Sequence, residues 1–253
     1  MKIAAQLYTV VQHMQTPGDM RESLKKIKDI GYDTIQLSSQ GSIDPNELKS
    51  YIDENNLTVC ASHNEYDDFI HNTDKVIKDN EIWGCKYIGL GSMPEKFRTG
   101  KDGIIKFASE IIPVAKYIKD AGYKFMYHNH AFDFIKMDGI TTISYLTENS
   151  NPDEVGILAD MMWVQMGGIN PIEFIQTYKD RLDVIHLKDM TVNYKSEWVI
   201  KEIGNGNMNY KAICEACEKH GSKWGAVEQD ICEGDPFDSL KMSYNYLNTL
   251  GYK

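Results

Sequence analysis

Arginine is scarce in this sequence, and positive charge as a whole is outnumbered. Among 253 residues only Arg21, Arg98 and Arg181 are arginines, and 27 Lys and Arg face 37 Asp and Glu, for a net charge of −10. A nucleic-acid-binding protein needs a basic footprint, so we expect no nucleic-acid partner. None of the three arginines lies in a phosphate-binding motif, which argues against a phosphorylated substrate.

Long hydrophobic runs and a disulfide pattern are also missing. No segment approaches the roughly 20 apolar residues of a membrane span, and the chain starts directly as a strand, without the apolar stretch of a signal peptide. The five cysteines are scattered and odd in number. Cys214 and Cys217 fall inside a helical pattern with no second pair to complete a zinc site. We therefore expect a cytoplasmic protein with reduced thiols and no membrane partner.

Linkers and low-complexity segments are absent, and a repeated unit takes their place. A helical pattern rich in Lys and Glu ends in glycine, and a hydrophobic strand begins about two residues later. This happens at Gly31, Gly84, Gly122 and Gly221. Glycine there supplies the left-handed residue that ends a helix, and Asn56 can serve the same purpose. We predict a single domain over residues 1–253.

The pattern predicts eight strands that alternate with eight helices. The strands fall near 2–8, 33–38, 57–62, 86–91, 124–129, 155–160, 182–188 and 223–229. The helices fall near 19–30, 45–55, 66–83, 101–121, 140–149, 171–179, 208–220 and 236–249. Such alternation implies parallel strands with right-handed crossovers. The fold class is α/β, and a (β/α)8 TIM barrel is the simplest closed form; a doubly wound open sheet is the alternative.

Four of the predicted strands end in residues that bind metals. These residues are His128, Asp160, His186 and Glu228. In a barrel the carboxyl ends of the strands surround a single mouth, so residues far apart in the sequence converge there. A mixed set of His, Asp and Glu predicts a site for one divalent metal ion.

Other residues near the predicted mouth are candidates for contact with a substrate. His63 follows the third strand and could bind a hydroxyl, relay protons, or hydrogen-bond to a ligand residue. Lys188 and Asp189 follow His186, and either substrate contact or an Asp–Lys pair explains them. Trp163 could form an apolar wall for a sugar ring. The glycines of 203–210 could form an anion-binding nest, although the segment matches no phosphate-binding fingerprint.

These motifs resemble the xylose-isomerase-like barrel superfamily, in the branch of sugar phosphate isomerases and epimerases. The resemblance runs nearly end to end. It rests on 5–10 (AQLYTV), 160–163 (DMMW), 186–189 (HLKD), 203–206 (IGNG) and 227–230 (VEQD). The resemblance implies one divalent ion (Mn, Mg, Co or Zn) bound by residues of strands five to eight. Three of these ligands carry over as Asp160, His186 and Glu228.

Strand five departs from the epimerase pattern. Many relatives have Glu-Asn-His where this chain has His128-Asn129-His130. A histidine can still bind the ion, as the resemblance to inosose dehydratases with a His-rich strand five implies. The resemblance makes Glu228 one catalytic base; its partner carboxylate is missing, and His130 or His63 could take that place. Gln36 stands where several relatives have a glutamate, and we count it among the substrate-binding candidates.

Three functional hypotheses follow. The first is a metal-dependent isomerase or epimerase that acts on a small keto-sugar or polyol through a metal-stabilised enediolate. The second is a metal-dependent lyase or dehydratase that acts on a 3-keto-sugar or inosose. The third is a non-catalytic sugar-binding barrel. The superfamily's AP endonucleases are disfavoured because the negative charge opposes DNA binding. We expect a small sugar as the partner, and the sequence leaves a homo-oligomer open.

Overall fold

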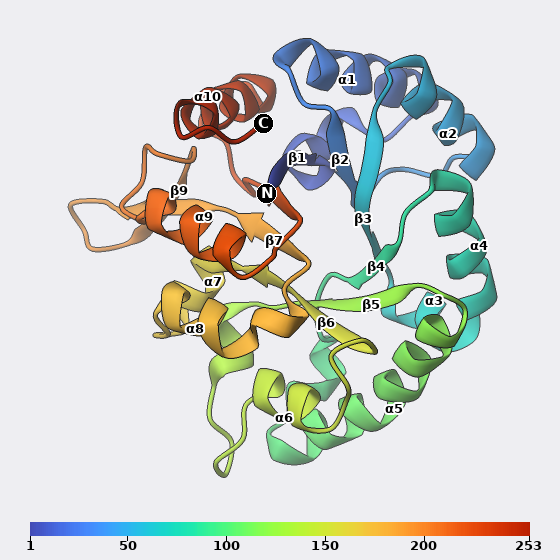
Figure 1. The fold of residues 1–253 in the computed structure, drawn as a ribbon, viewed down its shortest axis with the longest axis vertical. Helices are drawn as coiled ribbons and strands as arrows, with labels where there is room; N and C mark the ends of the chain where they lie inside the picture. Colours follow the sequence, from blue (N-terminus) through green and yellow to red (C-terminus); the bar gives the residue numbers. More distant parts are fainter.

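The computed structural model describes residues 1–253 and shows a closed parallel barrel surrounded by helices (Figure 1). The barrel strands are β1 (Lys2–Gln6), β2 (Thr34–Leu37), β3 (Thr58–Asn64), β4 (Tyr87–Leu90), β5 (Lys124–His128), β6 (Val155–Asp160), β7 (Val184–Leu187) and β10 (Trp224–Val227). The barrel closes where β1 pairs with β10, with Lys2 opposite Trp224. The predicted (β/α)8 fold is confirmed, and the open sheet is wrong.

Helices cover the outside of the barrel in chain order. They are α1 (Pro17–Ile30), α2 (Pro45–Glu54), α3 (Tyr66–His71), α4 (Thr73–Trp83), α5 (Lys101–Asp120), α6 (Thr142–Glu148), α7 (Met161–Met166), α8 (Pro171–Tyr178), α9 (Tyr210–Lys219) and α10 (Pro236–Thr249). Short 3₁₀ turns are η1 (Leu7–His13), η2 (Glu95–Phe97), η3 (Ala131–Phe134) and η4 (Lys179–Arg181). No helix combines the length and the apolarity that a bilayer crossing needs.

The predicted helix ends are confirmed by the backbone. Gly31, Gly84, Gly122 and Gly221 have φ values of 127°, 67°, 92° and 88°, and Asn56 has 51°. Side chains with a Cβ rarely adopt positive φ, whereas glycine does so at no steric cost. Each of these residues therefore ends a helix and returns the chain to the next strand.

Two predicted elements differ from the structure. The helix predicted over 66–83 is interrupted at Asn72, whose φ of −136° lies outside the helical range, and it continues as α4 from Thr73 to Trp83. The strand predicted over 2–8 ends at Gln6, because the Gln6 side chain accepts a hydrogen bond from Tyr8 N and the chain turns into η1.

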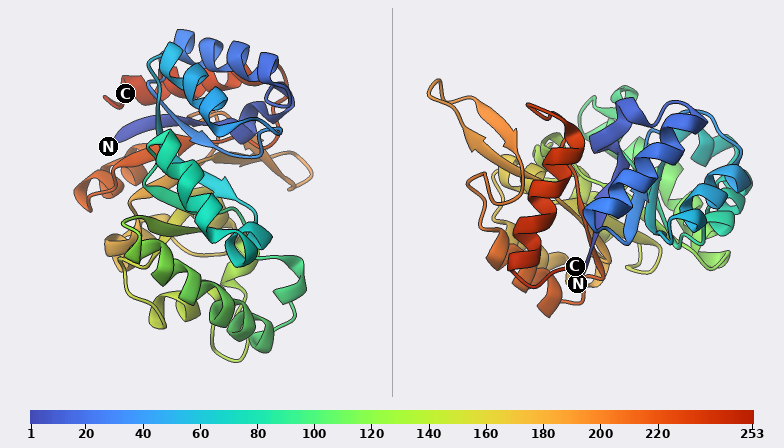
Figure 2. Two further views of the ribbon diagram at one scale, coloured as in Figure 1. Left: turned by 90° about the vertical axis from the view of Figure 1, so that its right-hand side faces the viewer. Right: turned by 90° about the horizontal axis from the view of Figure 1, so that it is seen from above.

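A hairpin, β8 (Asp189–Val192) with β9 (Trp198–Lys201), was not predicted. It lies outside the barrel and projects beyond the helical layer, as the right-hand view of Figure 2 shows. Short strands with exposed polar turns resemble a loop in sequence, which explains the omission.

The barrel interior is layered by the alternation of side chains along each strand. Its middle is apolar and made of small and medium residues, namely Ala4, Cys60, Ala61, Tyr87, Met126, Leu158, Val184 and Ala226. A larger apolar layer of 52 buried residues lies between strands and helices. Two positions further along the inward-facing series, the side chains become polar. The carboxyl end of the barrel therefore holds a buried polar layer above an apolar floor.

Candidate metal centre and active site

Four polar side chains of this layer converge on one point. His128 ends β5, Asp160 ends β6, His186 lies in β7, and Glu228 directly follows β10. All four are at least 95% buried. One potential ligand atom from each lies within 4.8 Å of the others. The structure thus brings together the four ligands proposed from the sequence.

The two histidines are held so that one ring nitrogen of each faces the cluster. His128 Nδ1 lies 2.9 Å from Gly91 O, and His186 Nε2 lies 2.9 Å from Gln36 Oε1. Both partners are acceptors, which assigns the hydrogen to these nitrogens. The remaining nitrogens, His128 Nε2 and His186 Nδ1, carry lone pairs and have no hydrogen-bond partner.

Each of the two carboxylates likewise has one oxygen hydrogen-bonded to the protein and the other oxygen facing the cluster. Asp160 Oδ1 accepts hydrogen bonds from Met162 N and Trp163 N at 2.9 and 3.1 Å and so begins α7. Glu228 Oε1 accepts a hydrogen bond from Gln6 Nε2 at 2.7 Å. Their other oxygens, Asp160 Oδ2 and Glu228 Oε2, are buried and outside hydrogen-bonding geometry.

The four remaining atoms, one from each side chain, face one another at short distances. His128 Nε2 lies 3.6 Å from Asp160 Oδ2, and His186 Nδ1 lies 2.8 Å from Glu228 Oε2. A buried polar atom without a hydrogen bond costs about 1–3 kcal/mol; a cation at this point would bind both imidazole nitrogens and share the two carboxylate oxygens with the ammonium of Lys188. Two imidazole nitrogens and two carboxylate oxygens form a donor set typical of divalent transition metals. The residues therefore fit a divalent ion.

Lys188 adds a buried positive charge beside these carboxylates. Its Nζ lies 2.7 Å from Glu228 Oε2, 3.1 Å from Asp160 Oδ2 and 3.0 Å from Asp230 Oδ2. Burial alone would lower the pKa of Lys188, but the three carboxylates raise it above its ordinary value. The ammonium stays charged, and the pKa of Glu228, which burial would raise, is held well below its usual range by Lys188 and His186.

His63 and Gln36 form a hydrogen-bonded chain next to the four-residue cluster. Gln36 is fully buried, and its Nε2 lies 3.0 Å from His63 Nε2 while its Oε1 holds His186. His63 Nδ1 lies 3.4 Å from Ser38 Oγ. Burial, together with His128 and His186, lowers the pKa of His63 well below its usual range. The sequence makes Gln36 a candidate for substrate contact. Because its amide nitrogen and oxygen are both hydrogen-bonded to histidines, we propose that Gln36 orients His63 and His186 instead.

His130 and Trp163 lie on the other side of the cluster. The ring of His130 is 4.8 Å from that of His128, 5.3 Å from that of Phe132 and 5.5 Å from that of Trp163. Burial, with a contribution from His128, lowers the pKa of His130 to about 3, so its imidazole is neutral at neutral pH. Its Nδ1 and Trp163 Nε1 are buried without partners. His130 lines the cavity that opens onto the cluster and is therefore available to a bound molecule, whereas Trp163 lies behind His130 and does not line it.

The glycine-rich segment after β9 binds a carboxylate of the protein itself. Backbone N–H groups of Gly204, Gly206 and Met208 donate to the Asp189 carboxylate at 3.0, 3.3 and 3.2 Å. A Cβ on Gly206 would lie 2.2 Å from Asp189 Oδ1, so glycine is needed there. The nest that these glycines could form therefore binds a structural carboxylate, and Asp189 does not line the cavity. The segment is also the tight turn with an Asn helix cap that its sequence indicates, since Asn209 caps α9.

A cavity of about 520 Å³ opens onto the cluster. Its lining includes His63, His128, His130, Lys188, Glu228 and Asp230, and the rest is formed by Tyr8, Ile231, Gly91 and three serines. Sites of this size bind small molecules. The sequence did not identify Asp230 or Gln6 as individual site residues. The motif over 227–230 included Asp230, whereas nothing in the sequence pairs Gln6 with a residue 222 positions away.

Comparison with known proteins agrees with this architecture. The family model for the xylose isomerase-like TIM barrel matches residues 24–242. An inosose dehydratase from Lacticaseibacillus casei is 23% identical over 255 residues, covering 86% of this chain and 85% of the relative.

Solved structures show the same fold. A sugar phosphate isomerase/epimerase from Parabacteroides distasonis ATCC 8503 has a TM-score of 0.79 at 20% identity, with 97% of this chain and 93% of that one covered. An L-ribulose 3-epimerase has a TM-score of 0.75 at 14% identity, with 99% and 94% covered. The chain belongs to the xylose isomerase-like TIM-barrel family.

Proposed function

We propose that this chain is a divalent-metal-dependent enzyme that removes the proton next to the carbonyl of a small keto-sugar or inosose. The observation that carries the proposal is the set of four buried ligand atoms on His128, Asp160, His186 and Glu228, which converge on one point and form no well-aligned hydrogen bond. The cavity of about 520 Å³ that opens onto them supports it, because a small molecule has access to the cluster. The family and its named relatives, which are isomerases, epimerases and dehydratases, support the same class of chemistry.

His128, Asp160, His186 and Glu228 would hold the ion. A bound divalent ion supplies Lewis acidity, which acidifies a C–H group next to a carbonyl and offsets negative charge on oxygen. The mixed nitrogen and oxygen donors suit Mn²⁺, Co²⁺ or Zn²⁺, and Mg²⁺ less well, because Mg²⁺ prefers oxygen ligands.

Glu228 and His130 are the proposed proton-transfer groups. Glu228 is ionised, lines the cavity and is fixed by Gln6, so its carboxylate can accept a proton from substrate. His130 also lines the cavity, and its neutral ring has a free nitrogen. We favour His130 over His63 as the second group because both ring nitrogens of His63 already have partners. Lys188 would hold a substrate oxygen by donating a hydrogen bond.

An isomerase or epimerase is the first form of this function. One group removes the proton and another returns it, to a neighbouring carbon or to the opposite face of the same carbon. Glu228 directly follows β10 and His130 lies just after β5, and these two strands are separated by β7 and β6 in the barrel. That placement supports a pair of bases with unequal chemistry.

A lyase or dehydratase is the second candidate, and a specific observation favours it. The β5 ligand is His128, so the carboxylate base that many epimerases carry there is missing. The protonated Lys188 can stabilise a departing hydroxyl by hydrogen bonding. The curated relative at 23% identity is a dehydratase.

Product analysis in D₂O tests the proposal. We expect protein reconstituted with Mn²⁺ to exchange the proton next to the carbonyl of a keto-sugar or inosose, and chelator-treated protein to lose this exchange. An isomerase or epimerase yields a deuterated isomer, whereas a dehydratase yields an unsaturated or deoxygenated ketone and water. A protein that binds the sugar but exchanges no proton would instead be a sugar-binding barrel.

Glu228→Gln provides the matched variant. The amide retains the shape of Glu228 but cannot accept the proton, so exchange should fall at least about a hundredfold, the contribution typical of a general base. Glu233→Gln, at an exposed position outside the cavity, removes the same charge and controls for it. Near-normal exchange in Glu228→Gln would exclude Glu228 as the base.

A further inference from the structure

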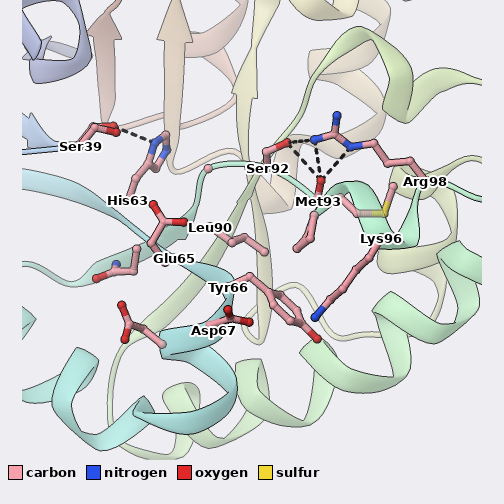
Figure 3. Close-up of a pocket in the computed structure, with 15 residues that line it drawn as sticks. Ser39, His63, Glu65, Tyr66, Asp67, Leu90, Ser92, Met93, Lys96 and Arg98 are labelled. Carbon is pink, nitrogen blue, oxygen red and sulfur yellow. Dashed lines mark hydrogen bonds between the residues drawn. The ribbon is translucent and has the colours of Figure 1, made fainter.

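A second cavity, of about 730 Å³, lies beside the first at the carboxyl ends of β3 and β4 (Figure 3). Its walls are the start of α3 and the segment 91–98. Five residues line both cavities, namely Ser38, Ser39, His63, Gly91 and Ser92. A molecule bound at the metal cluster can therefore extend into this second space.

Gly91 shapes the junction between the two cavities. Its carbonyl accepts the hydrogen bond from His128 Nδ1. A Cβ on Gly91 would lie 3.3 Å from His63 Nδ1, in tight contact with that ring. The absence of a side chain keeps the passage open beside both histidines.

Most of the residues that line the second cavity are polar, since only three of the fifteen are hydrophobic. One of the polar residues, Glu65, has unused hydrogen-bonding capacity. Glu65 occupies the N-cap position of α3 but caps no backbone group. Figure 3 shows Glu65 and Asp67 on the α3 side and Lys96 reaching across from the other wall, where its Nζ lies 4.5 Å from the Tyr66 ring.

The charges in this cavity disfavour an anionic ligand. Three carboxylates, of Glu65, Asp67 and Asp68, face two cations, of Lys96 and Arg98. The Arg98 guanidinium already donates to Met93 O at 2.7 Å and to Ser92 Oγ at 2.9 Å. Carboxylates and an ammonium group placed on opposite walls instead match the hydroxyls of a neutral sugar, which both donate and accept hydrogen bonds.

The geometry points to a substrate with two sugar rings: we infer that the reacting keto-sugar carries a second polyhydroxylated ring, which binds in this second cavity. The inference rests on the proposed function and names its substrate class. The first cavity already lies in the size range that binds a small molecule, so a single ring leaves the second cavity unused.

A kinetic comparison of two substrates tests this inference. We expect kcat/KM for a 3-keto-disaccharide to exceed that for the matching 3-keto-monosaccharide by at least about tenfold. In the double variant Glu65→Ala/Lys96→Ala this ratio should fall at least about fivefold. Glu95→Ala, an exposed neighbour that does not line the cavity, should leave the ratio unchanged. Equal values for the two substrates, or a ratio that the double variant does not change, would overturn the inference.

A binding measurement separates this inference from the proposed function. Calorimetry with cellobiose and glucose, which lack the reactive ketone, should show tighter binding of the disaccharide, and the double variant should lose the difference. A wild-type protein that turns over no keto-sugar yet shows this difference would refute the proposed function and retain the two-ring site. Preference for an aryl glycoside or for a sugar phosphate would refute the polyhydroxylated second ring.

Discussion

Lys188 places a buried ammonium group against the carboxylates of Asp160, Glu228 and Asp230. Its position after His186 made it a candidate for substrate contact, but the sequence could not show that three carboxylates surround it. These acidic residues lie on two other strands and meet Lys188 only because the barrel closes. The Lys188 ammonium therefore compensates part of the negative charge of these three buried carboxylates.

Lys188→Met tests this balance. In metal-free protein the carboxylates lose their buried counter-charge, so the free energy of unfolding should fall by about 3–5 kcal/mol. Saturating Mn²⁺ should recover much of the loss, because the ion compensates the same carboxylates. Chemical denaturation with and without Mn²⁺ measures both values. Lys201→Met, which breaks an exposed pair with Glu233, should cost less than about 1 kcal/mol; an equally small effect of Lys188→Met would contradict the assignment.

His128 is the residue that separates the two proposed forms of the reaction. His128→Glu adds the missing carboxylate, so it should bind metal at least as well and shift activity towards epimerisation of free ketoses. Glutamate cannot donate to Gly91 O as His128 Nδ1 does. His128→Gln, which can donate but stays neutral, therefore controls for the lost hydrogen bond. NMR measures the ratio of epimerised to dehydrated product in each variant. Efficient ketose epimerisation by the wild type, or complete loss of metal in His128→Glu, would show that His128 has another role.

The hairpin β8–β9 is the element that joins the surface to the candidate site. Trp198 on β9 is half-exposed and packs edge-on against Trp163, with ring centroids 6.0 Å apart. Trp163 in turn lies near His130 and 5.3 Å from Lys188 Nζ. The hairpin thereby positions Trp163, the side chain that the sequence suggested as a wall for a sugar ring.

Trp198→Ala should lower kcat/KM roughly two- to tenfold, the equivalent of the about 0.5–1.5 kcal/mol of an aromatic pair. The loss should be mainly in KM, because Trp198 supports the wall without touching the proton-transfer groups. Trp198→Phe keeps an aromatic contact and should recover most of the activity. Steady-state kinetics with a thermal melt of each variant measures this, and unchanged KM in Trp198→Ala would rule out the positioning role.

At the scale of the whole molecule, ends of the chain meet to close the barrel. β1 pairs with β10, and Ile3 N donates to Lys253 O at 3.1 Å. The four proposed ligands come from β5, β6, β7 and the end of β10, so an ion bound there would link four consecutive barrel segments. Metal binding should therefore raise the free energy of unfolding of the entire domain.

Addition of Mn²⁺ at about a hundred times its Kd should stabilise chelator-treated protein by about 2.7 kcal/mol. For a chain of this length that corresponds to a rise in Tm of roughly 5–11 °C. Asp160→Asn keeps the oxygen that begins α7 but removes the charge, so its Tm should respond little. Differential scanning calorimetry and elemental analysis, with close to one ion per chain expected, provide the check; a wild-type Tm that ignores Mn²⁺ would argue against the centre.

Local chemistry in the sequence determined the repeated unit of this protein. Glycine or asparagine with positive φ ended the helices, apolar runs formed the strands, and polar residues followed the apolar runs at the strand ends, since each feature depends on neighbours a few positions away. Only the tertiary structure decided which atom of each residue is free. Gln6 occupies one oxygen of Glu228, Gln36 holds His186, and Gly91 holds His128, over separations of 222, 150 and 37 residues. Barrel closure creates these contacts, because it brings side chains from every strand into one buried layer where each polar atom must find a partner or bind a ligand.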